Sequence, residues 1–160
     1  MLREVTDSDI PAICAIYNSY VTGSTITFEE EIVSIEAMKG RVAEITKTHP
    51  WLVCDLNRQV VGYAYAAAWK TRSAYRYSVE STVYLDSAHC HRGLGSALYR
   101  ELIGRLRAAE IHRIMGGIAL PNEASVALHE RLGFKKVAHF EEVGWKFGHW
   151  IDVGYWQLDL

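Results

Sequence analysis

The chain has 160 residues and a formal net charge of −2, with 49% hydrophobic and 22% charged residues. These values suit one folded domain over residues 1–160, and they give no electrostatic reason to expect a nucleic acid or an acidic membrane as partner. The sequence has three scattered cysteines, no signal-peptide pattern and no apolar run long enough to span a membrane. We therefore expect a cytoplasmic protein without a disulfide framework.

The first half of the chain predicts both strands and helices. Thr6 and Asp7 can cap a helix whose apolar residues follow helical spacing, and Pro50 disfavours helix in the residue before it. Runs rich in Tyr, Val and Ala predict buried strands. In chain order we expect a strand at 2–5, a helix after residue 7, a polar loop at 19–31, a helix at 34–49, and strands at 51–55, 59–69 and 78–85.

The second half predicts two helices and three strands. Leucines recur every four residues from Leu94 to Leu106, which predicts an amphipathic helix. Gly133 can adopt the left-handed conformation that ends a helix. We expect a strand at 112–119, a helix at 122–132, and strands at 135–145 and 150–158. The whole order predicts an α/β fold, in which a mixed sheet carries helices on its faces.

A glycine-rich turn joins the strand at 78–85 to the leucine-rich helix, and its sequence is His91-Arg92-Gly93-Leu94-Gly95-Ser96. Glycines let the backbone approach a ligand, the N–H groups at a helix start bind anions, and Arg92 adds a positive charge. Taken alone, the turn could equally be a tight connection. A Walker motif needs Lys before Ser or Thr, and a dinucleotide fingerprint needs a third glycine in the first βα unit, so neither pattern fits.

Further motifs accompany this turn in order along nearly the whole chain: Thr27-Phe28-Glu29, 63–66, 69–75, Val79-Glu80-Ser81-Thr82-Val83-Tyr84, 92–99, Leu120-Pro121-Asn122-Glu123-Ala124-Ser125, 128–134 and 146–153. Together they resemble the GCN5-related N-acetyltransferase (GNAT) superfamily, and more closely its phosphinothricin N-acetyltransferase branch. Cys90 stands where the superfamily motif Gln/Arg-x-x-Gly-x-Gly/Ala has Gln or Arg. Cysteine offers only a weak side-chain hydrogen bond, so we expect altered donor affinity rather than lost binding.

The resemblance implies the GNAT fold, a mixed and mostly antiparallel central sheet with helices on both faces, and acetyl-CoA as co-substrate. The pantetheine arm would pair with the strand backbone near residue 84, and a superfamily bulge there would aim an N–H at the thioester oxygen. Asn122 belongs to the donor-binding residues that the resemblance implies, but it could also simply cap the helix that it precedes. The implied donor-binding residues are Val83, Tyr84, Leu85, His91, Arg92, Gly93, Leu94, Gly95, Ser96, Asn122 and Ser125.

Two titratable residues are candidates for the chemistry. Amide formation from a thioester needs a neutral amine, and a nearby base supplies it. The resemblance implies that Glu80, on the polar face of its strand, is this base, although it could be a solvated strand residue. It also implies that His129 acts with Glu80 as acid or base, for which an ordinary pKa near 6.5 is suited. A lone histidine in a helix could equally be structural.

An amino-acid acceptor presents a carboxylate, for which arginine is the natural partner. Lys70 and Arg72 follow a buried strand, although charges near a hairpin could equally belong to the surface. The resemblance implies an acceptor site with Phe28, Lys70, Arg72, Tyr75 and Thr82. We expect no metal, because the segment 89–91 has no second ligand pair at zinc-like spacing.

The sequence thus predicts an acetyl-CoA-dependent N-acetyltransferase. Its acceptor would be the α-amine of a small L-amino acid or an analogue such as phosphinothricin, methionine sulfone or methionine sulfoximine. The resemblance also implies a homodimer, with the aromatic-rich C-terminal region available for its interface. Acetylation of a protein N-terminus or lysine is an alternative, and so is a non-catalytic acyl-CoA-binding domain.

Overall fold

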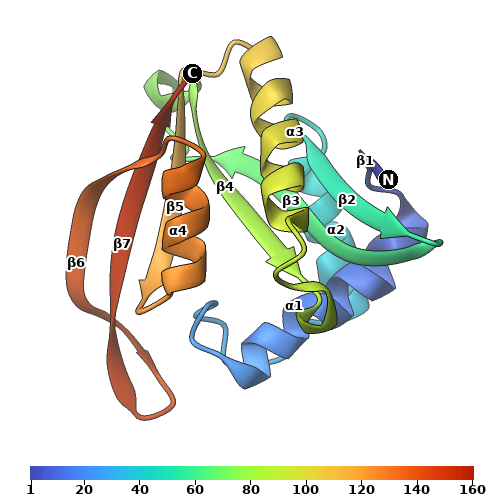
Figure 1. The fold of residues 1–160 in the computed structure, drawn as a ribbon, viewed down its shortest axis with the longest axis horizontal. Coiled ribbons are helices and arrows are strands. Elements are labelled where there is room, and N and C mark those ends of the chain that lie inside the picture. The colour runs from blue at the N-terminus through green and yellow to red at the C-terminus, as the bar shows by residue number, and fades with distance from the viewer.

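The computed structural model describes Met1 to Leu160 and contains one seven-stranded sheet with the strand order β1-β2-β3-β4-β5-β7-β6 (Figure 1). The strands are β1 (Leu2–Glu4), β2 (Trp51–Leu56), β3 (Gln59–Ala68), β4 (Ser78–Leu85), β5 (Arg113–Leu120), β6 (Lys135–Lys146) and β7 (His149–Asp159). The helices are α1 (Ile10–Gly23), α2 (Ile35–Ile45), α3 (Leu94–Ala108) and α4 (Glu123–Arg131).

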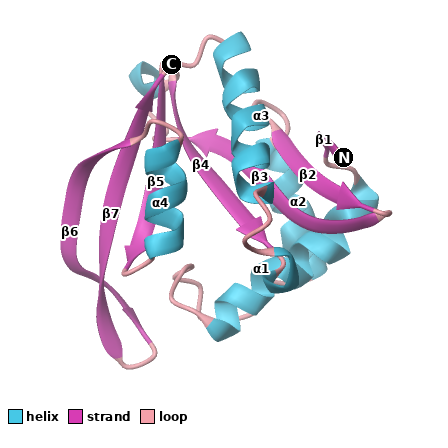
Figure 2. Cartoon of the chain, viewed as in Figure 1, coloured by secondary structure: helices cyan, strands magenta, loops and turns pink.

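The helices cover both faces of the sheet (Figure 2). α1 and α2 pack on one face, where Ile13 and Val53 are fully buried, and α3 packs on the other through Leu98 and Leu102. α4 lies beside α3 on that second face. This arrangement confirms the expected mixed, mostly antiparallel sheet with helices on both sides. None of the helices combines the length and the apolar character needed to cross a membrane.

The one parallel pair in the sheet is β4 with β5, and this pair separates along its length. Three residue pairs join the two strands, and Glu80 opposite Met115 is the last of them. β4 continues to Leu85 and β5 to Leu120, and Figure 1 shows the two strands diverging toward these ends. Backbone groups on the facing edges beyond Glu80 are therefore free to bind something other than a neighbouring strand.

Polar residues and residues with left-handed backbone angles lie at several element ends. The Ser34 hydroxyl accepts a hydrogen bond from the backbone N–H of Ala37 and caps α2. Asn57 and Arg58 adopt left-handed φ angles of 52° and 68° in the turn between β2 and β3. Gly133 has a φ of 95° just after α4, as expected for a residue that ends a helix.

Two predicted boundaries are wrong. The loop expected at 19–31 begins later, because α1 continues to Gly23. In this last turn the hydroxyls of Ser19 and Thr22 donate to helix carbonyls, and Val21 is fully buried, so a polar sequence remains helical. α2 ends at Ile45 rather than near residue 49, and irregular turns lead from there to β2.

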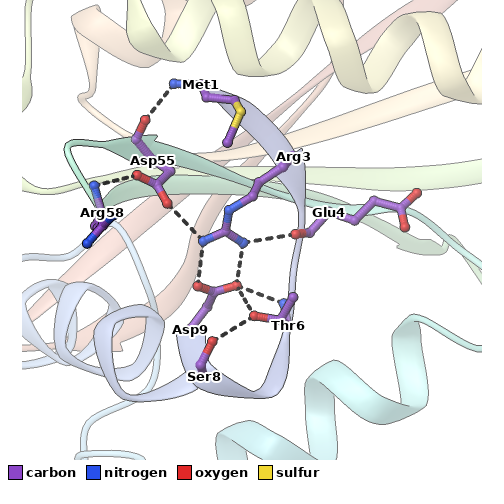
Figure 3. Close-up of polar contacts among 8 residues, drawn as sticks. All are labelled: Met1, Arg3, Glu4, Thr6, Ser8, Asp9, Asp55 and Arg58. Carbon is purple, nitrogen blue, oxygen red and sulfur yellow. Dashed lines mark hydrogen bonds and ion pairs between the residues drawn. The ribbon is translucent and has the colours of Figure 1, made fainter.

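An ion-pair network ties β1 to the start of α1 and to β2 (Figure 3). The Arg3 guanidinium donates to both carboxylate oxygens of Asp9, at 2.7 and 2.8 Å, and to Asp55 at 3.0 Å. Asp9 is 5% exposed and also accepts from the backbone N–H of Thr6. The hydrogen bonds from Arg3 lower the pKa of the Asp9 carboxyl more than burial raises it. A short edge strand is thereby held in register.

Candidate active site

A cavity of about 310 Å³ opens where β4 and β5 separate. Both strands line it, together with the segment after α1 and with residues of α3, α4 and β7. Glu80, Tyr99, His129 and Tyr155 bring titratable side chains to its walls. A cavity that combines apolar walls with a few convergent polar groups is typical of a ligand site.

Glu80 lies at the apex of this opening, on the last pair that joins β4 to β5. Burial raises the pKa of its carboxyl, and the positive charge of Lys70 opposes that shift. No hydrogen bond to a protein donor contributes to its pKa. A half-buried carboxylate with a raised pKa and no partner is suited to accept a proton from a ligand.

His129 reaches the cavity from α4 and is 3% exposed. Its Nδ1 donates to the backbone carbonyl of Ser125 at 2.8 Å, since a carbonyl can only accept. Nε2 is then free to accept from the Tyr99 hydroxyl, 2.9 Å away. Burial lowers the pKa of His129, so the imidazole is neutral near pH 7.

Tyr99 on α3 continues this hydrogen-bond chain into the sheet. Its hydroxyl also lies 3.2 Å from Ser81 Oγ, which in turn lies 3.3 Å from the carbonyl oxygen of Met115. Burial raises the pKa of Tyr99 well above its usual range, so its hydroxyl keeps its proton. Both ring nitrogens of His129 are engaged, and its Nε2 is hydrogen-bonded to a second cavity-lining residue, Tyr99.

Two adjacent glycines in β5 make room for Glu80 and His129. Successive residues of a strand face opposite sides of the sheet. A Cβ on Gly116 would lie 2.6 Å from His129 Nε2, and a Cβ on Gly117 would lie 3.1 Å from Glu80 Oε1. The two titratable groups therefore line one cavity from opposite faces of the sheet.

The glycine-rich turn lies beyond the end of β4 and has the geometry of an anion-binding nest. His91 and Gly93 have φ angles of 62° and 77°, and the backbone N–H groups of residues 91–96 donate to no protein acceptor. A Cβ on Gly95 would lie 3.6 Å from the Leu85 side chain, so the turn packs against the end of β4. These free donors at the start of α3 fit a phosphate-bearing ligand that runs along β4.

The structure brings eight of the predicted site residues together in the cavity: Phe28, Glu80, Thr82, Val83, Tyr84, Asn122, Ser125 and His129. Asn122 also caps α4 by accepting from the backbone N–H of Ser125, so both of its expected roles are compatible. Leu85 and the turn at 91–96 lie at the end of β4, outside the cavity lining.

Three predicted acceptor residues lie elsewhere. Lys70 and Arg72 line a separate pocket of about 460 Å³ together with His49 and Arg76. Tyr75 is 42% exposed and does not line the Glu80 cavity. The Lys70 ammonium lies 4.8 Å from the ring centre of Trp69, and its charge still acts on Glu80.

The predicted bulge in β4 is absent from its pairing with β3. The register between β3 and β4 is continuous from Gly62 opposite Leu85 to Ala68 opposite Val79. The free backbone edge of β4 arises instead from the departure of β5, because a strand that loses its neighbour needs no extra residue to expose its N–H groups.

One wall of the cavity is held by β6. Lys146 is 1% exposed and donates from Nζ to the backbone carbonyl of Thr27 at 2.8 Å. The neighbouring Phe28 ring packs against Gly144, where an added Cβ would lie 2.4 Å from two ring carbons. The segment after α1 is thus fixed to the β6–β7 hairpin.

Sequence reasoning assigned no role to several residues of this site. Two consecutive glycines inside a predicted strand, Gly116 and Gly117, signal a close approach by another group. Tyr99 directly follows Leu98 in the amphipathic helix, and its hydroxyl at a core position needs a buried partner. No signal in the sequence points to the contact between Lys146 and Thr27, because 119 positions separate them.

The fold and the site together define the class of protein. The sheet opens between the parallel strands β4 and β5, with Glu80 at the apex of the opening and an anion-binding turn near its open end. This arrangement is suited to an acyltransferase whose acyl donor carries phosphates. Residues 2–154 match the acetyltransferase (GNAT) domain family, and the chain belongs to this family. It is therefore an N-acetyltransferase that depends on acetyl-CoA.

Relatives with assigned names match almost the whole chain. A phosphinothricin N-acetyltransferase from Streptomyces viridochromogenes is 39% identical over 99% of this chain and 87% of its own length. An L-methionine sulfoximine/L-methionine sulfone acetyltransferase from Pseudomonas paraeruginosa is 35% identical over 99% of this chain and 94% of its own. The crystal structure of a phosphinothricin acetyltransferase from Sinorhizobium meliloti in complex with acetyl-CoA superposes with a TM-score of 0.97, at 35% identity over 100% of this chain and 88% of that one.

Proposed function

We propose that this protein acetylates the α-amine of a small L-amino acid or analogue, such as phosphinothricin, methionine sulfone or methionine sulfoximine, with acetyl-CoA as donor. The observation that carries the proposal is the unpaired, half-buried carboxylate of Glu80 at the apex of the β4–β5 opening. The names of the relatives support this acceptor class.

Glu80 acts as the base. It takes a proton from the acceptor ammonium, and the freed nitrogen attacks the thioester carbon. A C–N bond forms, the C–S bond breaks, and CoA leaves as a thiolate that needs one proton. The raised pKa of Glu80 brings its basicity closer to that of an effective base near neutral pH.

His129 and Tyr99 supply the proton on the other face of the sheet. The Tyr99 hydroxyl lines the cavity and is oriented by its hydrogen bond to His129 Nε2, so it can donate its proton to the departing thiolate and take up a replacement proton from solvent. After the attack, the nitrogen of the tetrahedral intermediate carries one excess proton, which it loses to solvent, or to Glu80 once Glu80 has passed its first proton to solvent. Acid–base assistance of this kind contributes about 10²- to 10⁴-fold in rate.

The glycine-rich turn holds the donor's phosphates. The free N–H groups of residues 91–96 and the guanidinium of Arg92 serve as donors, and the pantetheine amides pair with the free edge of β4 near Val83. Cys90 adds no strong donor beside this turn, so backbone groups carry most of the phosphate binding.

Phe28 and Thr82 form the acceptor side of the cavity, with Lys146 fixing the segment that carries Phe28. Lys70, Arg72 and Tyr75 remain proposed acceptor ligands. Arg72 lines a separate pocket, so its role requires movement of its loop toward the cavity. Arg72→Ala then raises the acceptor KM while leaving the acetyl-CoA KM unchanged, and an unchanged acceptor KM removes Arg72 from the site.

The base is tested by Glu80→Gln, which keeps the shape of the side chain and removes its basicity. We expect kcat/KM for thiol release from acetyl-CoA to fall about 10²- to 10⁴-fold. Glu36→Gln, at an exposed position in the first turn of α2, is the matched control and keeps full activity. Wild-type activity in Glu80→Gln would exclude the proposed mechanism.

The acceptor class is tested by comparing free amino acids with short peptides. We expect turnover with phosphinothricin and methionine sulfone and little with peptides. A structure named ribosomal-protein-alanine N-acetyltransferase, from Brucella melitensis, superposes with a TM-score of 0.98 at 34% identity, over 100% of this chain and 99% of that one. Preferred turnover of a peptide N-terminus would therefore shift the assignment to that class. Acetyl-CoA binding without turnover of any amine would indicate a non-catalytic domain.

We further propose a cytoplasmic homodimer. The three cysteines are free, as expected in a reducing compartment. The β6–β7 hairpin extends away from the helices (Figure 1) and carries large apolar side chains that are about half exposed, namely Val137, Phe140, Val143, Trp145, Phe147 and Trp150. A second copy of the chain would cover this surface. Light scattering at a dimer mass for the wild type and at a monomer mass for Trp145→Glu tests it.

A further inference from the structure

Ser81 is a buried polar residue of the cavity to which neither base catalysis by Glu80 nor the binding of the donor gives a role. It directly follows Glu80 on β4, so its side chain faces the opposite side of the sheet, toward α3. It is 5% exposed and lines the same cavity as Glu80. A buried hydroxyl needs hydrogen-bond partners, and the partners of Ser81 lead to the proposed acid, Tyr99.

The Ser81 hydroxyl lies between two acceptors. Its Oγ is 3.2 Å from the hydroxyl oxygen of Tyr99 and 3.3 Å from the carbonyl oxygen of Met115. A serine hydroxyl carries one proton, so it can donate to only one of these oxygens at a time. Both distances exceed the usual range of about 2.5–3.0 Å for such a bond. Neither acceptor therefore holds the proton tightly, and rotation of the hydroxyl group can transfer the hydrogen bond from one to the other.

Tyr99 needs a hydrogen-bond donor at the moment when it gives up its own proton. In the resting protein Tyr99 donates to His129 Nε2, because His129 Nδ1 already donates to the carbonyl of Ser125. Once the Tyr99 proton has passed to the thiolate, a negatively charged oxygen faces a nitrogen that carries no proton. Burial makes such an unpaired charge costly. Ser81 is the other hydrogen-bond partner of the Tyr99 oxygen, and it can donate.

From the location of its hydroxyl between Tyr99 and Met115, we propose that Ser81 is a positioning residue for the protonation of the leaving thiolate. While Tyr99 keeps its proton, Ser81 donates to the Met115 carbonyl. As the O–H bond of Tyr99 breaks and the S–H bond of CoA forms, Ser81 donates to the tyrosinate oxygen instead. This charge-assisted bond is shorter and stronger, and it lasts until solvent returns a proton to Tyr99. The inference rests on the proposed role of Tyr99 as the acid.

Ser81→Ala removes the hydroxyl, and two acyl donors reveal what is lost. Acetyl-CoA and its selenium analogue, acetyl-seleno-CoA, have nearly the same shape. A selenol is a stronger acid than a thiol, so a selenolate leaves more readily without a proton. In single-turnover mixing experiments, we expect Ser81→Ala to slow transfer from acetyl-CoA about 10- to 100-fold. Transfer from the selenium analogue should stay near the wild-type rate, whereas a merely structural role of Ser81 would slow both donors equally.

Two further variants control for the loss of the side chain. Ser81→Thr keeps a hydroxyl on the same β-carbon, and threonine suits a strand, so this variant should retain most of the rate with acetyl-CoA. Ser78→Ala removes a hydroxyl from the first residue of the same strand and should leave the rates with both donors unchanged. Far-UV circular dichroism and the KM for acetyl-CoA check that each variant is folded and binds the donor.

Tyr99→Phe separates this proposal from the acid role on which it rests. If Tyr99→Phe slows acetyl-CoA selectively and Ser81→Ala does not, the proposal for Ser81 is overturned and the acid role of Tyr99 stands. If neither variant distinguishes the two donors, both roles are overturned, while Glu80→Gln still tests the base. A Ser81→Thr variant that is folded and as slow with acetyl-CoA as Ser81→Ala also overturns the proposal.

Discussion

Replacing Gly116 by alanine adds one methyl group where β5 faces the imidazole of His129. The new Cβ would lie 2.6 Å from Nε2, whereas ordinary van der Waals contact begins at 3.4 Å, so the ring must move by the difference of about 0.8 Å. The hydrogen bond between Tyr99 and Nε2, now 2.9 Å, then exceeds the usual range of about 2.5–3.2 Å. Glu80 is on the other face of the sheet and keeps its position.

The expected result is a loss of turnover larger than the loss of stability. If Tyr99 and His129 protonate the thiolate, kcat falls by about 10²-fold or more. Overpacking of this kind destabilises the fold by about 1–3 kcal/mol, which leaves a folded enzyme. The assay is thiol release under saturating acetyl-CoA and acceptor, with denaturant unfolding measured on the same sample.

Gly104→Ala is the control for this experiment. Gly104 lies in α3 with open space at its Cβ position, so alanine there should keep full turnover and stabilise the helix by about 0.5–1 kcal/mol. Wild-type kcat in a folded Gly116→Ala variant would show that the position of the imidazole does not matter for the reaction. The Tyr99–His129 route would then be refuted.

Three further changes have defined outcomes. Lys70→Met removes the charge that lowers the pKa of Glu80, so the acidic limb of the pH profile of kcat/KM moves to higher pH, and an unmoved limb contradicts this. Arg3→Met leaves the Asp9 carboxylate buried without its guanidinium and costs about 2–4 kcal/mol in the free energy of unfolding at pH 7. Since the pKa of Asp9 is lowered in the folded protein, this difference shrinks as the pH falls below about 4, and a constant difference refutes the assignment. Gly144→Ala pushes the facing aromatic ring into the acceptor cavity, so the KM for bulky acceptors rises more than that for acetyl-CoA, and equal changes argue against a specificity role.

Much of this fold could be predicted because the signals are local. Periodic leucines identify α3, a serine caps α2 and Gly133 ends α4, each within a few neighbouring residues. The extension of α1 to Gly23 could not be predicted from these rules, because hydroxyl groups and the full burial of Val21 stabilise that turn. Burial is a tertiary property that the local pattern does not contain.

The candidate site likewise combines features that local sequence patterns predict with features that depend on the tertiary structure. Glu80 and His129 were identifiable as candidates, but their position on opposite faces depends on how β4 and β5 separate, which no local pattern encodes. Arg72 shows the opposite case. An arginine is chemically suited to bind the carboxylate of an amino acid, but in this structure Arg72 lines a different pocket. Residue chemistry indicates what a side chain can do, whereas strand register decides what it can reach.

The separation of β4 from β5 also bears on the lifetime of the protein. Three residue pairs join the half-sheets β1–β4 and β5–β7, so we expect the amides of this narrow seam to exchange with solvent before those of the core. A donor molecule lying in that seam would bridge the two halves and suppress their opening by mass action. The cellular supply of acetyl-CoA would then set how long each copy survives proteolysis, as well as how fast it works.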